Sequence, residues 1–393
     1  MSMTDEQFNA FAAAMPDVRR AETEQEREAI FAFRYDVYAK ELGHKFGAFD
    51  HSGHRMHDEE DDKEYTTLLY TADEKGLTGT ARLRHWEPGG VPPKDFNCYS
   101  MEGFTGIDSL HVGEIGRLMV RPDRRGGLIL VALVWAILDH QKSDRHCDLL
   151  FADCVPGLVR HYERMGCRRY AGRMIPTPDG LMMPLVIVVS DTEHLRAINS
   201  VLAPKGERMT VEPLDPALFT ELFDEHNVPV QFDKALVRAA IEDGVAANVG
   251  FLSQISGESI EALAEKGFII RVPTGELLTE VGLGQRELFV VIDGEFESFS
   301  GERSLRRIYP GEVVGEVAFF SSDGHRTASV RCIEDGRVLV LRRHVLDELR
   351  VSAPAVAAEI LFHLARTMAD RTGRAHLAPA TPRETKYPAP AML

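Results

Sequence analysis

The sequence predicts an α+β protein made of two dissimilar folding units. Up to about residue 200, apolar strands such as 65–71 alternate with segments of helical periodicity, which is typical of a mixed sheet with flanking helices. From 267 to 342, short strands bounded by Gly and Pro follow one another, which indicates a β-roll. The 393 residues exceed what one small core organises, so at least two domains are expected.

The chain is expected to divide into four segments. They are a mixed-sheet domain at 20–203, a helical connector at 204–249, a β-roll with C-terminal helices at 250–372, and a proline-rich disordered tail at 373–393. The first 20 residues are expected to be loosely ordered. No DNA-reading helix module follows the β-roll, which disfavours a transcription factor.

Periodicity and turn residues give the individual elements. A helix begins near Glu24. The other elements expected in the first domain are strands 65–71, 77–84, 111–120, 148–153 and 181–190, and helices 127–141, 157–165 and 192–201, the last capped by Thr192. Further helices are expected at 216–226, 233–243, 344–349 and 353–371.

Composition narrows the function classes. The formal net charge of −16 disfavours bulk nucleic-acid binding. Five cysteines without CxxC spacing fit free thiols in a reducing cytoplasm. No apolar run is long enough to span a membrane, and the N-terminus lacks the pattern of a signal peptide. We therefore expect a cytoplasmic protein.

The segment 311–330 has the pattern of a pocket for a cyclic nucleotide. Gly315 permits close approach of the backbone to a phosphate. The turn at 316–320 would direct free N–H groups at that phosphate. Arg326 can clamp its oxygens in bidentate fashion. The Glu316 carboxylate can accept a hydrogen bond from a ribose 2′-hydroxyl.

This segment resembles the phosphate-binding cassette of cyclic nucleotide-binding domains in kinases, ion channels and catabolite activator proteins. The resemblance covers about 251–371 and implies cAMP or cGMP as an allosteric ligand, without choosing between them. The alternative is a β-roll that kept its fold and lost its ligand. The pocket residues implied are Gly315, Glu316, Val317, Ala318, Arg326, Thr327 and Ala328.

Three patterns mark the first domain. A strand at 114–120 runs into a basic, glycine-containing loop and a helix start, an arrangement that suits a pyrophosphate. Tyr162 precedes a glycine turn at Gly166 by four residues. The strand 77–84 carries Gly79 and Arg82.

These patterns resemble the GNAT-type acyltransferase superfamily. Val120, Pro122, Arg125 and Gly126 match its donor-binding loop, and Tyr162 matches its tyrosine near the thioester sulfur. Leucines stand where the family has its second and third loop glycines. The acyl-donor contacts implied are Leu118, Met119, Val120, Arg125, Gly126 and Gly127.

A narrower resemblance is to long-chain N-acyl amino acid synthases, which are relatives of the acyl-homoserine-lactone synthases. It rests on the segments 33–43 and 79–83 and on Glu114 with Arg117, within about 25–190. Such enzymes often take acyl chains from acyl carrier protein. The acyl donor is therefore expected to be acyl-CoA or acyl carrier protein.

Amide formation requires a neutral amine to attack a thioester carbonyl. Tyr162 is the expected acid for the leaving thiolate and Glu114 the expected base, while the strand 118–120 would stabilise the oxyanion. Tyr162 is alternatively a packed aromatic, and Glu114 with Arg117 alternatively a structural ion pair. Arg34, Arg82 and Arg117 are the expected substrate contacts; alternatively, Arg34 and Arg82 neutralise an acidic loop.

That loop, 50–62, contains His51, His54 and His57 among aspartates. Its donors suit a divalent metal, but a solvated polar loop is the favoured interpretation and no metal site is predicted. The run 58–62 is likewise expected to be a hydrated surface segment.

Together these patterns predict an N-acyltransferase regulated by a cyclic nucleotide, with an amino acid or a protein lysine as acceptor. The alternative is a non-catalytic sensor whose first domain is a protein-binding platform. Long C-terminal helices in such sensors often pair, so a homodimer is a further expectation.

Overall fold

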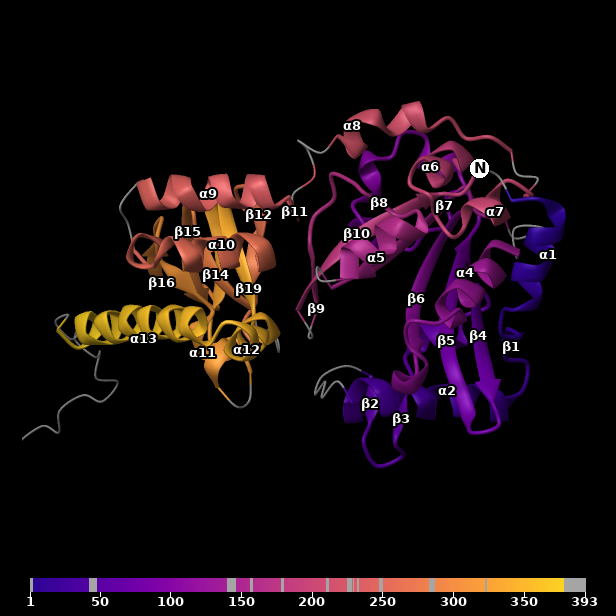
Figure 1. Ribbon diagram of the computed structural model, residues 1–393, viewed down its shortest axis with the longest axis horizontal. Helices are drawn as coiled ribbons and strands as arrows, with labels where there is room; N and C mark the ends of the chain where they lie inside the picture. Colours follow the sequence, from indigo (N-terminus) through magenta and orange to yellow (C-terminus); the bar gives the residue numbers. More distant parts are fainter. Residues whose placement is uncertain are drawn as a thin grey trace, which may run out of the picture. The chain divides into compact units, whose positions relative to one another are not determined.

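The computed structural model divides into two compact units. The first is Met1–Pro229 with Thr279–Gln285, and the second is Val230–Leu278 with Arg286–Leu393 (Figure 1). The division falls inside the expected connector. The structure describes residues 3–377 except 42–47, 140–145, 156–157, 178–179, 210–211, 225–227, 229, 232, 247–249, 283–286 and 322–323.

The first unit is built on one mixed sheet of order β1-β4-β5-β6-β7-β10-β8, with β9 paired to β10. Only β6 and β7 among these described pairs are parallel. The strands are β1 (Arg19–Arg20), β4 (Thr66–Asp73), β5 (Gly76–Trp86), β6 (Val112–Val120), β7 (Leu149–Cys154), β8 (Arg168–Arg169), β9 (Ile175–Thr177) and β10 (Gly180–Val188). A two-stranded ribbon, β2 (Phe49–Asp50) with β3 (Arg55–Met56), stands apart.

Helices and short turns flank this sheet. Helix α4 packs against β4, β5 and β6, and the close approach needs a glycine: a Cβ on Gly79 would lie 2.6 Å from Ile129 Cγ2. Helix α2 also packs against β5. The helical elements are α2 (Glu24–Tyr35), the π-helix η1 (Asp36–Glu41), the 3₁₀ turns η2 (Glu59–Asp62), η3 (Met101–Gly103), η4 (Ile107–Ser109) and η5 (Pro122–Arg124), and helices α3 (Pro93–Cys98), α4 (Ile129–Asp139), α5 (Val159–Met165), α6 (Thr192–Ala197) and α7 (Ala203–Gly206).

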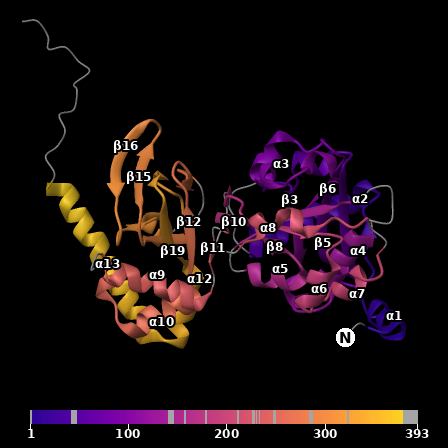
Figure 2. The ribbon, with the colours of Figure 1, turned by 90° about the horizontal axis from the view of Figure 1, so that it is seen from above.

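The second unit contains a β-roll of two sheets, of order β11-β12-β19-β14-β17 and β13-β18-β15-β16. Helices α9, α10 and α13 gather beside the roll, and their apolar faces share one core with its strands (Figure 2). The strands are β11 (Val230–Gln231), β12 (Phe268–Val272), β13 (Leu277–Thr279), β14 (Glu287–Val291), β15 (Glu295–Ser300), β16 (Arg303–Ile308), β17 (Val313–Val314), β18 (Ser329–Glu334) and β19 (Gly336–Arg342). The helices here are α9 (Lys234–Ala246), α10 (Gly257–Lys266), α11 (Glu316–Phe320), α12 (Arg343–Ser352) and α13 (Pro354–Leu377), with the turn η9 (Leu252–Gln254); η8 (Pro216–Phe219) and α8 (Thr220–Phe223) precede them.

The α+β prediction, with a mixed sheet followed by a β-roll, is confirmed. Three local expectations differ from the structure. Residues 5–13 form helix α1 (Asp5–Ala13), which has a capping box at Thr4. Helix α6 is capped by Asp191, because its carboxylate accepts from the His194 N–H. Helix α13 runs to Leu377, so 373–377 are helical; the rest of the expected tail lies outside the described residues.

The order around α1 has a packing cause. The Phe8 ring stacks on Trp135 with centroids 5.4 Å apart, and the Arg208 guanidinium lies 4.3 Å from the Phe8 ring centroid. Aromatic stacking and a cation–π contact therefore hold a segment whose polar sequence gave no such signal. In the described part of the chain, no helix is both long and apolar enough to cross a membrane.

Candidate functional site

Strand β6 leaves its parallel neighbour partway along its length. The β6–β7 register runs from Val112↔Leu149 to Ile115↔Ala152 and stops there, although β6 continues to Val120. On its other edge, β6 pairs with β5 through an irregularity near Thr80/Arg82, where Arg117 has a φ of +50°. The expected oxyanion segment 118–120 therefore lies beyond the point where β6 and β7 cease to pair.

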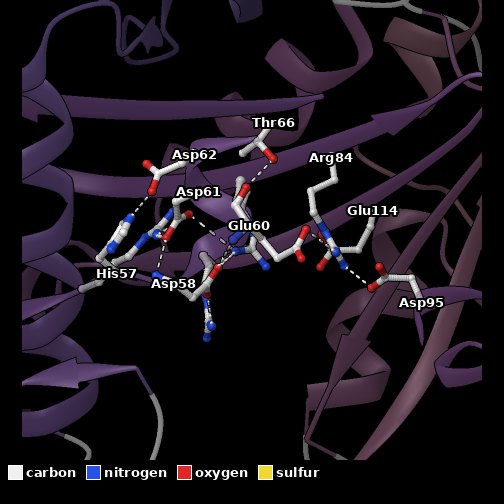
Figure 3. Close-up of polar contacts among 12 residues, drawn as sticks. His57, Asp58, Glu60, Asp61, Asp62, Thr66, Arg84, Asp95 and Glu114 are labelled. Atoms are coloured by element: carbon white, nitrogen blue, oxygen red, sulfur yellow. Dashed lines mark hydrogen bonds and ion pairs between the residues drawn. The ribbon is translucent and has the colours of Figure 1, made fainter. Parts of the chain in front are cut away.

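The three arginines expected to bind substrate converge on two aspartates. Arg34 Nη1 donates to both carboxylate oxygens of Asp61, at 2.8 and 2.9 Å. Arg82 Nη1 and Arg117 Nη2 donate to opposite oxygens of Asp58, at 2.7 and 2.6 Å. Figure 3 shows Asp58 and Asp61 side by side on the turn η2. Arg34 and Asp61 are fully buried.

Glu114 belongs to a neighbouring cluster and is bonded to Arg84. Arg84 Nε donates to Glu114 Oε2 and Nη2 to Asp95 Oδ1, each at 2.7 Å (Figure 3). Arg84 Nη1 lies 3.3 Å from Glu60 Oε2. The alternative of an ion pair between Glu114 and Arg117 is not what the structure shows. Glu114 pairs with Arg84, and Arg117 pairs with Asp58.

The run 58–62 is not the hydrated segment expected. It folds into η2 with a capping box between Asp58 and Asp61, and Asp61 is buried. The interpretation that Arg34 and Arg82 neutralise the acidic loop is therefore correct. It does not exclude substrate binding, since three guanidiniums here face two carboxylates. Arg34 Nε and Nη2, Arg82 Nε and Arg117 Nε are buried with no hydrogen-bond partner among the described residues.

Asp58 gives a stability test. Burial tends to raise its pKa, but the charges of Arg82 and Arg117 outweigh burial and hold the pKa well below its usual range. Asp58→Asn should lower the free energy of unfolding at pH 7 by about 3 kcal/mol, because two guanidiniums lose their carboxylate. Urea unfolding at several pH values measures this loss.

The sign of the pH dependence follows from the depressed pKa. Asp58 stabilises the fold above its unfolded pKa of about 3.9 and loses that contribution as the pH falls through its folded pKa. The gap between wild type and Asp58→Asn should thus shrink below about pH 4. Asp123→Asn, at an exposed ion pair with Arg121, is the control and should leave the free energy of unfolding nearly unchanged. A gap that stays constant down to pH 3 contradicts the assignment.

Two further buried groups belong to the proposed site: Tyr162, and Asp153, a carboxylate that the sequence did not single out. Burial raises the pKa of Tyr162 well above its ordinary value, and Cys154, Cys167 and Asp153 add to the effect. Asp153, at the end of β7, has its pKa raised by burial and then by the charge of Glu114. The Tyr99 hydroxyl donates to Asp153 Oδ1 at 2.8 Å. The charge of Glu114 thus influences Asp153, and Asp153 in turn influences the protonated phenol of Tyr162.

The expected donor-binding loop follows β6 directly. Gly126 has a φ of +77°, and no atom lies within 4 Å of a Cβ built on it. Arg125 forms a bidentate pair with Glu41, at 2.6 and 2.9 Å, and its Nε donates to the Val120 carbonyl. Gly127 precedes the start of α4 by two residues. Met119 is buried, whereas Leu118 and Val120 are half-buried.

Arg326 is the central residue of the nucleotide cassette. Its Nη1 and Nη2 donate to the carbonyls of Gly315 and Glu287, at 3.1 and 2.7 Å, and its guanidinium lies 5.2 Å from the Phe289 ring centroid. Burial lowers its pKa to about 10. Its Nη2 also lies 3.8 Å from the Glu287 carboxylate, and a buried guanidinium of this kind gains from a further anion such as phosphate.

Gly315 is required beside this arginine. Its φ is +89°, and a Cβ there would lie 2.0 Å from Arg326 Nη1. Glu316 begins helix α11, as expected, and its charge is felt by Arg326. The remaining predicted contacts line the same segment: Ala318 is buried, Ala328 is half-buried, and Val317 and Thr327 are exposed.

Each histidine of the 50–62 loop contacts a neighbouring side chain. His51 Nδ1 lies 3.0 Å from the Tyr35 hydroxyl, and His57 Nε2 lies 2.8 Å from Asp62 Oδ2. His54 adopts a φ of +50° with its ring against Tyr35. Their positions are explained by these contacts.

Comparison with known proteins assigns a family to each part of the chain. Residues 29–190 match the model of the N-acyl amino acid synthase FeeM family, and residues 269–352 match that of the cyclic nucleotide-binding domain. The first match contains the Arg34, Glu114 and Tyr162 positions, and the second contains Gly315 and Arg326.

Curated relatives include the Pycsar effector protein BcPycTIR of Burkholderia cepacia, 26% identical over 109 residues, or 28% of this chain and 36% of that protein. The cGMP-dependent protein kinase egl-4 of Caenorhabditis briggsae is 33% identical over 107 residues, or 27% of this chain and 14% of that protein. The chain thus spans about a third or less of the length of these two relatives.

Two solved structures resemble different parts of the chain. The CoA-dependent acyl-homoserine lactone synthase BjaI, with SAM and isopentyl-CoA, is 16% identical with a TM-score of 0.37, covering 53% of this chain and 98% of that one. A cyclic nucleotide-binding domain from Methylobacillus flagellatus KT is 18% identical with a TM-score of 0.34, covering 38% of this chain and 88% of that one. By its family matches, the chain joins an N-acyl amino acid synthase FeeM domain, which is acyltransferase-like, to a cyclic nucleotide-binding domain.

Proposed function

We propose that this protein is a GNAT-type N-acyltransferase that moves an acyl group from a thioester to the amine of an amino acid, under the control of a cyclic nucleotide. The proposal is supported by the placement of Glu114 on β6, Asp153 on β7 and Tyr162 on α5, where the charge of Glu114 influences the buried Asp153 and Asp153 influences the Tyr162 hydroxyl. The FeeM match over the same residues supports it.

In the proposed reaction the amine nitrogen attacks the thioester carbonyl, a C–N bond forms and the C–S bond breaks. The buried carboxylates Glu114 and Asp153 take the ammonium proton; the raised pKa of Asp153 suits it to this task. The backbone at 118–120 stabilises the oxyanion. Tyr162, which stays protonated at neutral pH, gives its proton to the departing thiolate and is reprotonated by the second proton that the nitrogen loses as the amide forms.

The cluster of three arginines favours a free amino acid over protein lysine as acceptor. Arg34, Arg82 and Arg117 carry one positive charge more than Asp58 and Asp61 neutralise, and several of their N–H groups are buried without a described partner. A substrate carboxylate supplies both the missing charge and the missing acceptors. A lysine side chain in a protein has no such carboxylate.

The state of the donor loop favours acyl carrier protein over coenzyme A as the donor's carrier. Coenzyme A brings a pyrophosphate that needs cations, but Arg125 is already paired with Glu41, and Arg121 and Arg124 with Asp73. The phosphopantetheine arm of a carrier protein makes smaller demands on this loop.

The proposal is tested by measuring the release of free thiol from acyl-CoA and from acylated acyl carrier protein. Each amino acid is supplied in turn as the acceptor. The saturating nucleotide is present throughout, and the product is identified by mass spectrometry. An N-acyl amino acid is expected, at a higher rate from acyl carrier protein. If no thioester is bound or consumed, the first unit is a non-catalytic platform and the proposal fails.

A further inference from the structure

One row of side chains crosses three neighbouring strands at the edge of the sheet where β6 and β7 begin. The register pairs Trp86 of β5 with Val112 of β6, and Val112 with Leu149 of β7. The residues just outside these positions are Glu87, His111 and Asp148. This edge is the opposite end of β6 from the expected donor loop, and no part of the proposed reaction uses it.

His146 joins this row and completes a group of potential metal ligands. The imidazole rings of His111 and His146 have centroids 3.9 Å apart. One donor atom from each of His111, His146 and Asp148 can be chosen so that all lie within 4.8 Å of one another. Glu87 Oε2 lies 3.2 Å from His111 Nε2. Two imidazole nitrogens and carboxylate oxygens are ligands that zinc prefers.

The distances fit a ligand shell better than a hydrogen-bond network. His111 Nδ1 and Asp148 Oδ2 are 3.7 Å apart, which is too long for a hydrogen bond. Two ligands of a tetrahedral zinc ion, each about 2.1 Å from the metal, stand roughly 3.4 Å apart. Small side-chain rotations would bring these donors around one ion.

The surroundings already orient the ligands. The backbone N–H of His111 donates to Asp148 Oδ2 at 2.9 Å. The backbone N–H of Asp148 donates to the His111 carbonyl at 2.8 Å. The buried His85 has its Nε2 2.9 Å from the His146 carbonyl oxygen. Such outer contacts reduce the entropy lost when a metal is captured.

We propose that His111, His146 and Asp148 bind one zinc ion, with Glu87 holding the other ring nitrogen of His111, and that this ion fastens the start of β7 to the start of β6. The three ligands are half-buried, whereas the Glu87 side chain, which faces Nε2 of His111, is largely exposed. Its role is structural, because the site lies at the far end of β6 from Tyr162 and Val120.

Metal is first removed from the full chain with a chelator. The protein is then titrated with zinc in competition with a chromophoric chelator, which measures affinity and stoichiometry. A separate titration with cobalt shows the coordination geometry through its visible absorption. We expect one equivalent of zinc, a tetrahedral cobalt spectrum and a higher Tm with zinc. Loss of an outer-shell partner typically weakens metal affinity by roughly 10- to 100-fold. His111→Gln and His146→Gln remove ligands themselves, so each should weaken zinc affinity by at least that much. The control His51→Gln, in the other histidine loop, should bind as wild type does.

Glu87→Gln provides a variant whose folding is not in question, because the Glu87 side chain is 69% exposed. It should fold normally and bind zinc more weakly. The proposal is overturned if wild type holds no stoichiometric metal, if the His111 and His146 variants bind as wild type does, or if binding is lost in His51→Gln instead.

Discussion

Arg326→Ala should weaken binding of cyclic AMP or cyclic GMP by about 30-fold or more, because the loss of one member of a buried charged pair costs about 2–5 kcal/mol. Arg326 is the buried cation of the cassette, held by the carbonyls of Gly315 and Glu287 with burial lowering its pKa. The nucleotide phosphate is expected to give this guanidinium a stronger anionic partner. Isothermal titration calorimetry with both nucleotides measures the loss and identifies the preferred ligand.

Arg331→Ala is the matched control. Arg331 lies on β18 of the same roll, but its half-exposed side chain pairs with Glu297 rather than with the cassette. It should bind the nucleotide as wild type does. If Arg326→Ala binds as tightly as wild type while remaining folded, the cassette does not hold the phosphate through this residue.

Tyr162→Phe should lower kcat by about 10²- to 10⁴-fold, the range expected when a positioned general acid is removed. Phenylalanine keeps the aromatic ring of Tyr162 and removes only its hydroxyl, so Tm should change little. Single-turnover release of thiol from the preferred acyl thioester measures the effect on chemistry alone.

Tyr170→Phe separates an acid from a packed aromatic. The Tyr170 hydroxyl is buried and donates to the Tyr99 carbonyl at 2.6 Å, so its removal should lower stability by about 1 kcal/mol and leave kcat unchanged. If Tyr162→Phe behaves like this control, losing stability but not turnover, then Tyr162 is a packing residue.

The sheet and the β-roll were predictable because their signals are local. Strands 65–71 and 77–84 carry apolar runs separated by a charged turn, and the structure pairs them as β4 and β5. Helix α1 was not predictable in this way, since its order depends on Trp135, which lies more than 100 residues away in the sequence.

The acidic run shows the same limit at the site. Five consecutive acidic residues at 58–62 look like a solvated loop, and only the fold brings Arg34, Arg82 and Arg117 around Asp58 and Asp61. The alternation of Arg82 and Arg84 on one strand, opposite Glu114, was the available clue, because alternate residues share a face. Asp153 gave no local signal at all.

The nucleotide cassette differs in that its ligand contacts are close in sequence. Gly315 and Arg326 are separated by eleven residues, and the positive φ of Gly315 with its contact to Arg326 follows from that short segment. The proposed catalytic residues come instead from β6, β7 and α5, so their placement depends on the whole sheet.

The most direct test of the account is the rate of acyl transfer with and without saturating cyclic nucleotide, measured in wild type and in Arg326→Ala. A coupling of about 1–3 kcal/mol predicts that the nucleotide changes the wild-type rate by roughly 5- to 150-fold and leaves the Arg326→Ala rate unchanged. Equal wild-type rates in the presence and absence of bound nucleotide would contradict the proposed control of catalysis.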